Sequence, residues 1–320
     1  MIFEATAPGK VILFGEHAVV YYRPAIAVPV ADVRARAVLE PARTGRGFRI
    51  IAPDLKQDYW LDQAAPADPL ATMVQLTIQH LDQAAPPPAS LIITSTIPLG
   101  RGLGSGAAIS TAIARVLGQF FNQILPPAEI SSLVYETEKL YHGTPSGVDN
   151  TVIAYEQPVY FIKGRPIQRL TLGQPFTLVV GDTGRIAPTH QVVGEVRRRW
   201  QAAPQLYEGY FDEIEAIVAQ ARLAIAQDMF PLATIGKLMD QNQELLENLG
   251  VSSPELSGLI AAARQAGALG AKLSGAGWGG NMIALALPDT AATVAQALSQ
   301  AGAAGVLITQ VRGAAARRLE

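Results

Sequence analysis

Residues 97–108, with the sequence IPLGRGLGSGAA, constrain the fold more than any other stretch of this 320-residue chain. The run before them, residues 91–97, is rich in β-branched residues and predicts a strand, whereas residues 107–121 carry apolar residues at helical spacing. The glycines between them, at positions 100, 102, 104 and 106, allow positive φ angles and a close backbone approach. Their N–H groups and the positive end of the helix predict a cradle for an anion such as the phosphates of a nucleotide.

This loop does not match the two commonest phosphate-binding fingerprints. No Lys-Ser or Lys-Thr pair closes it, as a P-loop requires, and its spacing is not that of a dinucleotide fingerprint followed by an acidic ribose ligand. Taken alone, the loop could also be a turn that only joins a strand to a helix. Other segments of the chain have to decide between these interpretations.

Composition places the chain among globular proteins that bury sizeable cores, because 49% of its residues are hydrophobic and 16% are charged. A length of 320 residues is enough for two packed domains. The formal net charge of -2 gives no electrostatic footprint for nucleic acid or an anionic membrane. The absence of cysteine excludes a disulfide framework and a thiolate metal site. Without a leader pattern or an apolar run of about 20 residues, we expect a cytoplasmic protein with no nucleic-acid or membrane partner.

Residues 7–20 place polar groups in a strand-like apolar run. Lys10 lies between Gly9 and Val-Ile-Leu, where an unpaired ammonium would be costly to bury, so we expect it to face a cleft or an anion. A surface lysine at the start of a strand is the alternative. Glu16 and His17 follow the run, and in isolation they could form a turn or cap a helix.

A second group of polar residues follows the helical pattern of residues 127–142. This helix is predicted to end at Gly143, and the turn after it, which contains Pro and Gly, would lead Asp149 back toward Glu138. Two carboxylates could then share one site. An isolated Asp149 could equally cap a helix or a turn, and Glu136 is interpreted as part of a solvated helix face.

Glycines return in residues 271–285 between two strand-like runs, a pattern that alone favours a hairpin. Other strands are predicted over residues 32–40, 48–52, 176–181 and 306–311. Apolar residues three and four apart predict helices over residues 70–83, 189–199, 207–227, 232–248, 254–267 and 289–302. We interpret these as packing elements rather than sites.

Three segments together resemble the GHMP kinase family. PLGRGLGSGAA, residues 98–108, resembles its second motif, with Gly106 where most members have a second serine. KLSGAGWGG, residues 272–280, resembles its third motif. PGKVILFGEHAVVYYRPAIA, residues 8–27, is similar to the first motif of the mevalonate kinases within this family, with Tyr22 where they usually have glycine.

Two further segments extend the resemblance over the whole chain. HGTPSGVDN, residues 142–150, resembles the mevalonate kinase segment that carries the catalytic aspartate, and DTGRIAPT, residues 182–189, resembles the segment that opens the second domain. The resemblance implies an α+β, two-domain GHMP kinase fold. Residues 1–180 would form an N-terminal α/β domain with a left-handed crossover like that of ribosomal-protein-type folds, and residues 181–320 a C-terminal ferredoxin-like domain.

The resemblance also implies an activity, the ATP- and Mg2+-dependent transfer of a phosphoryl group to the 5-hydroxyl of mevalonate in isoprenoid precursor biosynthesis, by a homodimer. The catalytic residues would be Asp149, which accepts the proton of the hydroxyl, and Lys10. Glu138 and Ser105 would hold the magnesium ion. The nucleotide would be bound by Pro98, Gly100, Gly102, Leu103, Gly104, Ser105, Gly106 and Ala107. The acceptor would be bound by Glu16, His17, Thr189 and Ala276.

Two alternatives remain open. A sibling kinase of the family would act on phosphomevalonate, homoserine or a sugar, and the long match of the first motif argues against it. A catalytically silent, ligand-binding member of the fold is the other, and intact Lys10, Glu138 and Asp149 argue against that. A related decarboxylase is disfavoured further, because this chain contains the lysine of the first motif.

Overall fold

The computed structural model describes residues 1–42, 47–142, 145–229 and 231–313. Contacts between residues divide the chain into two compact units, neither of which is one consecutive stretch. The first comprises Met1–Gly9, Asp32–Leu99 and Gly104–Glu156, and the second comprises Lys10–Ala31, Gly100–Leu103 and Gln157–Glu320. The domain boundary expected after residue 180 stays a prediction. The predicted helix end at Gly143 lies outside the described residues.

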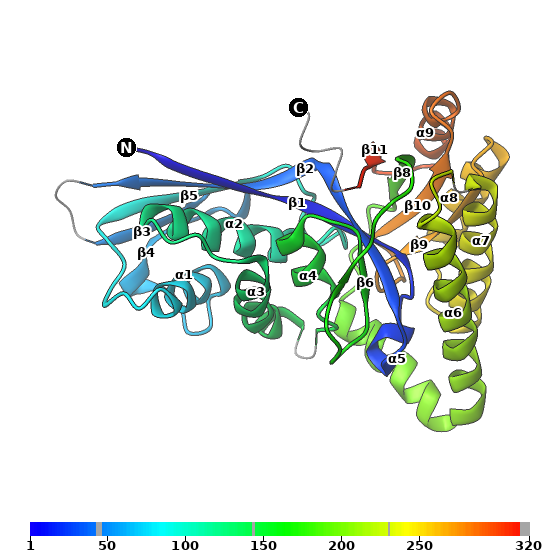
Figure 1. Cartoon of the computed structure of the whole chain (residues 1–320), viewed down its shortest axis with the longest axis horizontal. Coiled ribbons are helices and arrows are strands. Elements are labelled where there is room, and N and C mark those ends of the chain that lie inside the picture. The colour runs from blue at the N-terminus through cyan, green and yellow to red at the C-terminus, as the bar shows by residue number, and fades with distance from the viewer. Residues whose placement is uncertain (43–46, 143–144, 230, 314–320) are drawn as a thin grey trace. The chain divides into compact units, whose positions relative to one another are not determined.

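The first unit combines a sheet with four helices, which Figure 1 shows on one face of that sheet. Its strands are β1 (Phe3–Phe14) and β2 (Ala25–Pro41), which both continue into the second unit, β3 (Phe48–Ala52), β4 (Gln57–Trp60) and β5 (Ala89–Ser95). Its helices are α1 (Pro69–His80), α2 (Ser105–Phe120), α3 (Pro127–His142) and α4 (Val148–Tyr155). Short 3-10 turns η2 (Pro53–Leu55) and η3 (Leu61–Gln63) flank β4.

Strand order in this sheet is β4-β3-β5-β2, and β1 also pairs with β2. Strand β5 is parallel to β3 and antiparallel to β2. The chain between the two parallel strands passes through β4 and α1, as a crossover connection requires. The left hand of this crossover stays a prediction. Helix α1 begins where the sequence provides a cap, because Asp68 accepts a hydrogen bond from the backbone N–H of Ala71 at 2.8 Å.

The second unit contains the ferredoxin-like arrangement that the resemblance implied. Its four-stranded antiparallel sheet consists of β8 (Phe176–Asp182), β9 (Gly270–Ser274), β10 (Asn281–Ala286) and β11 (Gly305–Val311). The spatial order β11-β8-β10-β9 places the fourth strand beside the first and the third beside the second. Helices occur between the first and second strands and between the third and fourth, so the chain follows the β-α-β-β-α-β pattern.

The helices of this unit are α5 (Thr189–Ala202), α6 (Pro204–Ile225), α7 (Leu232–Asn248), α8 (Pro254–Gln265) and α9 (Ala291–Gln300). Helix α8 packs on β9 and β10, and α9 packs on β8 and β11. The unit also contains the 3-10 turn η1 (Ala18–Tyr21), and the beginning of β2 pairs there with β6 (Val159–Phe161), which pairs with β7 (Gln168–Arg169). The predicted periodicities of residues 127–142 and 232–248 correspond to α3 and α7.

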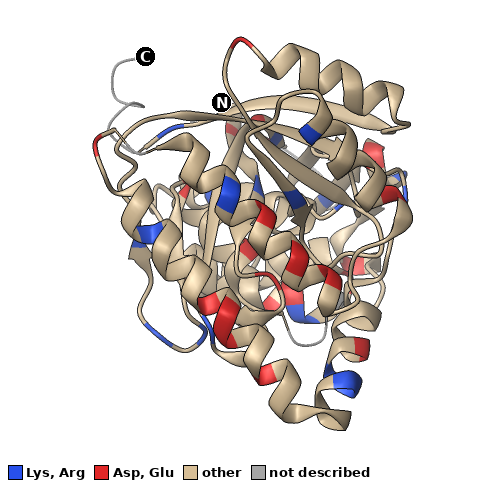
Figure 2. Cartoon of the chain, turned by 90° about the vertical axis from the view of Figure 1, so that its right-hand side faces the viewer, with Lys and Arg blue, Asp and Glu red and all other residues tan. Residues whose placement is uncertain are grey.

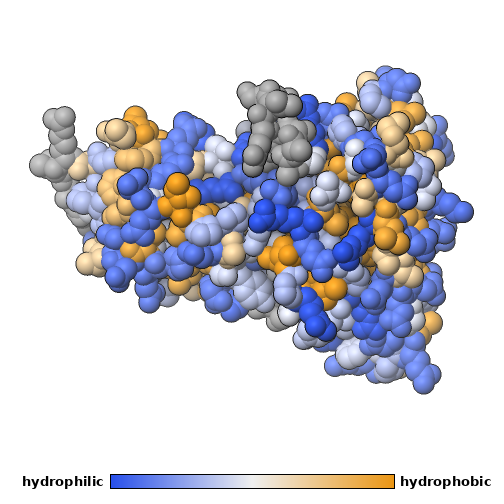
Figure 3. Space-filling model, viewed as in Figure 1, coloured by the Kyte–Doolittle hydropathy of each residue, from blue (hydrophilic) through white to orange (hydrophobic). Residues whose placement is uncertain are grey.

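Charged and apolar residues are mixed in the views of Figures 2 and 3. Figure 2 marks acidic and basic positions, and several of them form pairs, such as Glu195 with Arg198 and Arg199 at 2.7 Å. On the face shown in Figure 3, apolar residues lie in small groups among polar ones. Among the described residues, no helix is long and apolar enough to cross a membrane.

Tyr22 occupies a left-handed backbone position, with a φ of 66°, where the first motif of the family usually has glycine. Because a side chain in this region costs about 1–2 kcal/mol, we expect Tyr22→Gly to raise the free energy of unfolding by about 1 kcal/mol. Tyr22→Ala is the control, since it removes the exposed ring but keeps a Cβ at positive φ. Urea denaturation of both variants measures the difference, and equal stabilities would contradict the prediction.

Candidate active site

Residues 275–280 connect β9 to the antiparallel β10 through a glycine turn in the second unit. Gly275, Gly277 and Gly280 have φ angles of 105°, 89° and 70°, which side chains rarely adopt. A Cβ added to Gly277 would lie 2.1 Å from the carbonyl oxygen of Val251. The predicted hairpin is present, and its turn requires glycine both for its φ angles and for its close packing.

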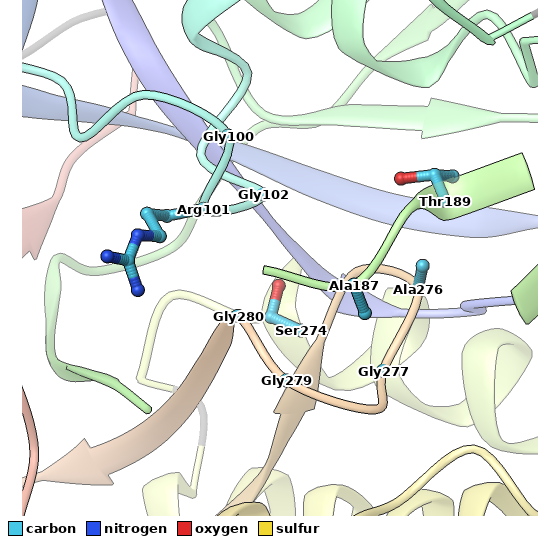
Figure 4. Close-up of a pocket in the computed structure, with 10 residues that line it drawn as sticks. All are labelled: Gly100, Arg101, Gly102, Ala187, Thr189, Ser274, Ala276, Gly277, Gly279 and Gly280. Carbon is cyan, nitrogen blue, oxygen red and sulfur yellow. The ribbon is translucent and has the colours of Figure 1, made fainter. Parts of the chain in front are cut away.

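The glycine turn forms one side of a pocket with an empty volume of about 310 Å³, shown in Figure 4. Most of the lining residues are glycine or alanine. Thr189 and Ser274 also line the pocket, and the hydroxyl of Ser274 hydrogen-bonds with the backbone N–H and carbonyl oxygen of Ile12 at 3.0 Å. The lining residues are Gly100, Arg101, Gly102, Ala187, Thr189, Ser274, Ala276, Gly277, Gly279 and Gly280. Four residues to which the sequence assigned ligand binding, Gly100, Gly102, Thr189 and Ala276, therefore line one pocket. The glycines and the alanine among them leave room for a ligand to approach the backbone closely.

The part of the phosphate loop that belongs to the second unit, residues 100–103, is fixed by polar contacts. The side-chain amide of Asn281 donates to the carbonyl oxygen of Arg101. The guanidinium of Arg101 pairs with Asp182, at 3.3 Å between Nη1 and Oδ1. The carbonyl oxygen of Leu103 accepts from the N–H of Lys10 at 2.9 Å. This segment is therefore held in place before any ligand binds.

A buried charged cluster joins the first motif to the third. Its members are Lys10, Glu16, His17 and Lys272, whose exposed fractions are 3%, 1%, 5% and 0%. Glu16 Oε1 accepts from Lys272 Nζ, and the ring Nε2 of His17 lies 2.8 Å from the carbonyl oxygen of Ala276, to which it donates. Lys10 is thus buried rather than a surface lysine, and its charge stabilises the ionised form of Glu16.

Burial sets the electrostatics of this cluster. It raises the pKa of Glu16 and lowers the pKa of Lys272, while their ion pair opposes both shifts. Among the described residues, Glu16 Oε2 has no hydrogen-bond partner. One oxygen of Glu16 is therefore committed to Lys272, and the other can still accept a hydrogen bond.

We expect His17 to make the stability of the protein depend on pH. Burial lowers its pKa from 6.5 to about 4, and the charge of Lys272 acts in the same direction. Because the unfolded chain takes up the proton first, the free energy of unfolding should fall as the pH decreases from 6.5 to about 4, by at most about 3 kcal/mol. Urea denaturation across this range measures the effect.

The control for this prediction is His17→Asn. Asparagine does not titrate in this range, and it tolerates the positive φ of 61° found at this position. The variant should lose the contribution of His17 to the pH dependence. Parallel pH profiles for the two proteins would contradict the prediction.

The rest of the phosphate loop belongs to the first unit, where α2 begins at Ser105. Gly104 precedes it with a φ of 76°, and no side chain caps the helix. The N–H groups of the first turn, which includes Gly106 and Ala107, therefore have no side-chain cap that competes with an anion. Pro98 is exposed in the same unit. These features fit the predicted binding of phosphates.

Glu138 and Asp149 lie on neighbouring helices of the first unit. Glu138 is 4% exposed on α3, and Asp149 is half-buried in the first turn of α4. Helix α3 packs against both α2 and α4, so the helices that carry Ser105, Glu138 and Asp149 form one cluster. The structure thus brings these three helices together, while a site shared by the two carboxylates stays a prediction. The individual roles stay predictions.

No group of three His, Asp or Glu side chains that could hold a metal occurs among the described residues. Mg2+ usually keeps several waters and binds one or two carboxylates together with substrate phosphates. The nearly buried carboxylate of Glu138 matches that requirement.

Sequence reasoning missed Lys272, which provides the counter-charge of Glu16. The available signal was the same one that singled out Lys10, namely a lysine within an apolar strand run. It also missed Asn281 and Asp182, which hold the phosphate loop through Arg101. Polar residues at the ends of strands are common, so these two carried no comparable signal.

Two family models match the chain, one in its N-terminal half and one in its C-terminal half. The family model described as GHMP kinases N terminal domain matches residues 71–157, and the one described as GHMP kinases C terminal matches residues 225–304. The chain is 36% identical over 318 residues to the mevalonate kinase of Thermococcus sibiricus, covering 93% of each chain. It is 36% identical over 316 residues to that of Pyrococcus furiosus, again covering 93% of each.

A solved structure is similar over the same extent. The crystal structure of L. major mevalonate kinase in complex with R-mevalonate superposes with a TM-score of 0.82 at 29% identity, covering 97% of this chain and 96% of that one.

Proposed function

The chain belongs to the GHMP kinase family, and from that premise we propose that it transfers the γ-phosphoryl group of ATP to the 5-hydroxyl of mevalonate, giving 5-phosphomevalonate. The observation that carries the proposal is the pocket that gathers Gly100, Gly102, Thr189 and Ala276, with His17 hydrogen-bonded to its wall at Ala276. Phosphoryl transfer needs mainly positioning and neutralisation of charge, which rigid backbone donors and buried cations supply.

Asp149 is proposed as the residue that orients the acceptor hydroxyl and accepts its proton. Its half-exposed position in the first turn of α4 leaves it accessible to a substrate. Lys10 would stabilise the negative charge that develops on the hydroxyl oxygen. Its nearly complete burial supports this role, because a lysine charge in a site of low dielectric acts more strongly than one in water.

Glu138 and Ser105 are proposed to hold magnesium, which when bound neutralises charge on the β- and γ-phosphates. The first turn of α2, with Gly106 and Ala107, would contact the phosphates through its N–H groups. Since Gly106 has no hydroxyl to offer the metal, Ser105 or a water would take that role in this chain.

Glu16, His17 and Thr189 are proposed to bind the acceptor. Glu16 Oε2 is suited to accept a hydrogen bond from a hydroxyl of the substrate, because Oε1 is already paired with Lys272. The hydroxyl of Thr189 at the pocket offers a second polar contact.

The experiment that tests the proposed function is a measurement of ATP consumption with magnesium and four acceptors, mevalonate, phosphomevalonate, homoserine and galactose. Turnover with mevalonate alone is the expected result. Turnover with one of the other acceptors would support the kinase activity but would contradict mevalonate as the acceptor. No turnover with any acceptor would favour a silent ligand-binding member of the family.

A homodimeric and cytoplasmic enzyme is proposed as well, on the family resemblance. Light scattering of the purified protein tests the oligomeric state, and fractionation of the source cells tests the location.

A further inference from the structure

A small polar cluster joins α3 to α4 inside the first unit. The side-chain amide of Asn150 donates to the carbonyl oxygen of Ser131 at 3.0 Å and to its hydroxyl at 2.9 Å. The hydroxyl of Thr151 lies 3.4 Å from that of Ser131 and donates to the carbonyl oxygen of Gly147 at 2.7 Å. Asn150, Ser131 and Thr151 are 5%, 5% and 2% exposed.

Such a cluster fixes the docking of one helix on another more tightly than apolar packing does. Apolar burial is non-directional, whereas the hydrogen bonds of a buried amide are directional and their loss costs free energy. The two bonds of Asn150 end on one residue of α3, so a shift of α4 by a fraction of an ångström weakens both.

The cluster lies next to Asp149 and Glu138, the residues that are proposed to act as the base and to hold magnesium. Asn150 directly follows Asp149 in the first turn of α4. Ser131 precedes Glu138 by seven residues on α3, which places both on the same face of that helix. The hydrogen bonds between Asn150 and Ser131, which we call the joint, therefore connect the backbone that carries Asp149 to the helix that carries Glu138.

We propose that Asn150 is a positioning residue for phosphoryl transfer, which holds Asp149 in place by locking the first turn of α4 to Ser131 of α3. The inference rests on the proposed function, in which Asp149 is the catalytic base. A misplacement of about 1 Å can lower a rate by about 10²-fold. Loss of the joint therefore lowers kcat more than it lowers the affinity for ATP.

The other end of α4 provides a matched control. Glu156 follows the helix and accepts from both Arg34 and Arg115, and Arg115 also donates to the carbonyl oxygen of Ala154 at 2.9 Å. Glu156→Gln weakens this ion-pair network, so it destabilises the same helix without touching the joint at Ser131.

The test compares Asn150→Ala, Ser131→Ala and Glu156→Gln by thermal unfolding, by amide hydrogen exchange of residues 148–151, and by steady-state kinetics well below the lowest Tm. We expect Asn150→Ala to speed exchange in the first turn of α4 and to lower kcat on the order of 10-fold to 10²-fold, with the KM for ATP changed less than about 2-fold. Ser131→Ala keeps the carbonyl acceptor, so it should lower kcat by about 3-fold. Glu156→Gln should lower Tm but leave kcat within about 2-fold.

Several results would overturn the proposal. If amide exchange in the first turn of α4 is unchanged in Asn150→Ala, Asn150 does not hold this turn against Ser131, whether or not the enzyme turns over. If Glu156→Gln loses as much kcat as Asn150→Ala and the two variants have equal Tm, the role of Asn150 is purely structural. Should Asn150→Ala fail to fold, an unchanged kcat and exchange rate in Ser131→Ala would overturn it. Failure of the proposed function is a separate result, namely no turnover by the parent enzyme with any acceptor.

Discussion

Asp149→Ala is expected to lower kcat with mevalonate by a factor on the order of 10² or more, while the affinity for ATP changes little. A general base acts on the proton of the acceptor hydroxyl in the transition state, so its removal affects the chemical step rather than nucleotide binding. Because Asp149 is half-exposed in the first turn of its helix, its replacement should cost little stability. Initial rates of ATP consumption and nucleotide titration measure the two effects.

Glu136→Ala is the matched control for this prediction. Glu136 is a carboxylate of the neighbouring helix α3, where it pairs with Lys139 at 2.7 Å. Its side chain is 51% exposed. It is interpreted as part of a solvated helix face, so its removal should leave kcat unchanged. Near-normal turnover by Asp149→Ala would contradict a catalytic role for Asp149. Equal losses of kcat in the two variants would indicate a general disturbance of α3 and α4 rather than the loss of a base.

Local periodicity predicted most of the fold. Helix α7 coincides with the predicted range, because its apolar residues recur at helical spacing and Pro231 precedes it. Helix α4 was not predicted as a helix. Its start lies behind Pro145 and Gly147, which read as turn residues, and it has only eight residues, too few for a clear period. The first residues of β2 were also missed, because Pro24 and Pro29 read as breaks in a strand.

The sequence predicted the glycine-rich turns of the site well, but it predicted the pairing of distant side chains poorly. Glycine-rich motifs carry a strong signal, since a positive φ or a close contact demands glycine, as at Gly277. The ion pair of Glu16 with Lys272 joins residues 256 positions apart, so no local pattern contains it. The resemblance covers both motifs but assigns no role to Lys272. Only the fold shows that this lysine is the counter-charge of Glu16.

The largest expected effect on stability is that of Lys272→Met. The side chains of Lys272 and Glu16 are both 0% exposed, and Lys272 also donates to the carbonyl oxygen of Leu273 at 2.6 Å. Removing the lysine leaves the buried carboxylate without its ion-pair partner and with Lys10 as the remaining charge that stabilises it, which costs about 3–5 kcal/mol. Urea denaturation at pH 8 measures this loss. A variant as stable as the parent would show that Glu16 is neutral or hydrated in the folded protein.

The pH dependence of the variant separates a lost charge partner from a lost packing contact. With Lys272 replaced, burial still raises the pKa of Glu16 above its ordinary value of 4.5, so the folded chain binds a proton more readily than the unfolded chain. The deficit should therefore shrink as the pH falls from the raised pKa toward 4.5. The double variant Glu16→Leu with Lys272→Met should recover most of the stability at pH 8, because an apolar pair of similar volume replaces a buried ion pair at little cost. The double variant should still fail to phosphorylate mevalonate, because Glu16 is proposed to bind the acceptor. If instead the stability deficit of Lys272→Met is the same at every pH, the loss comes from packing alone.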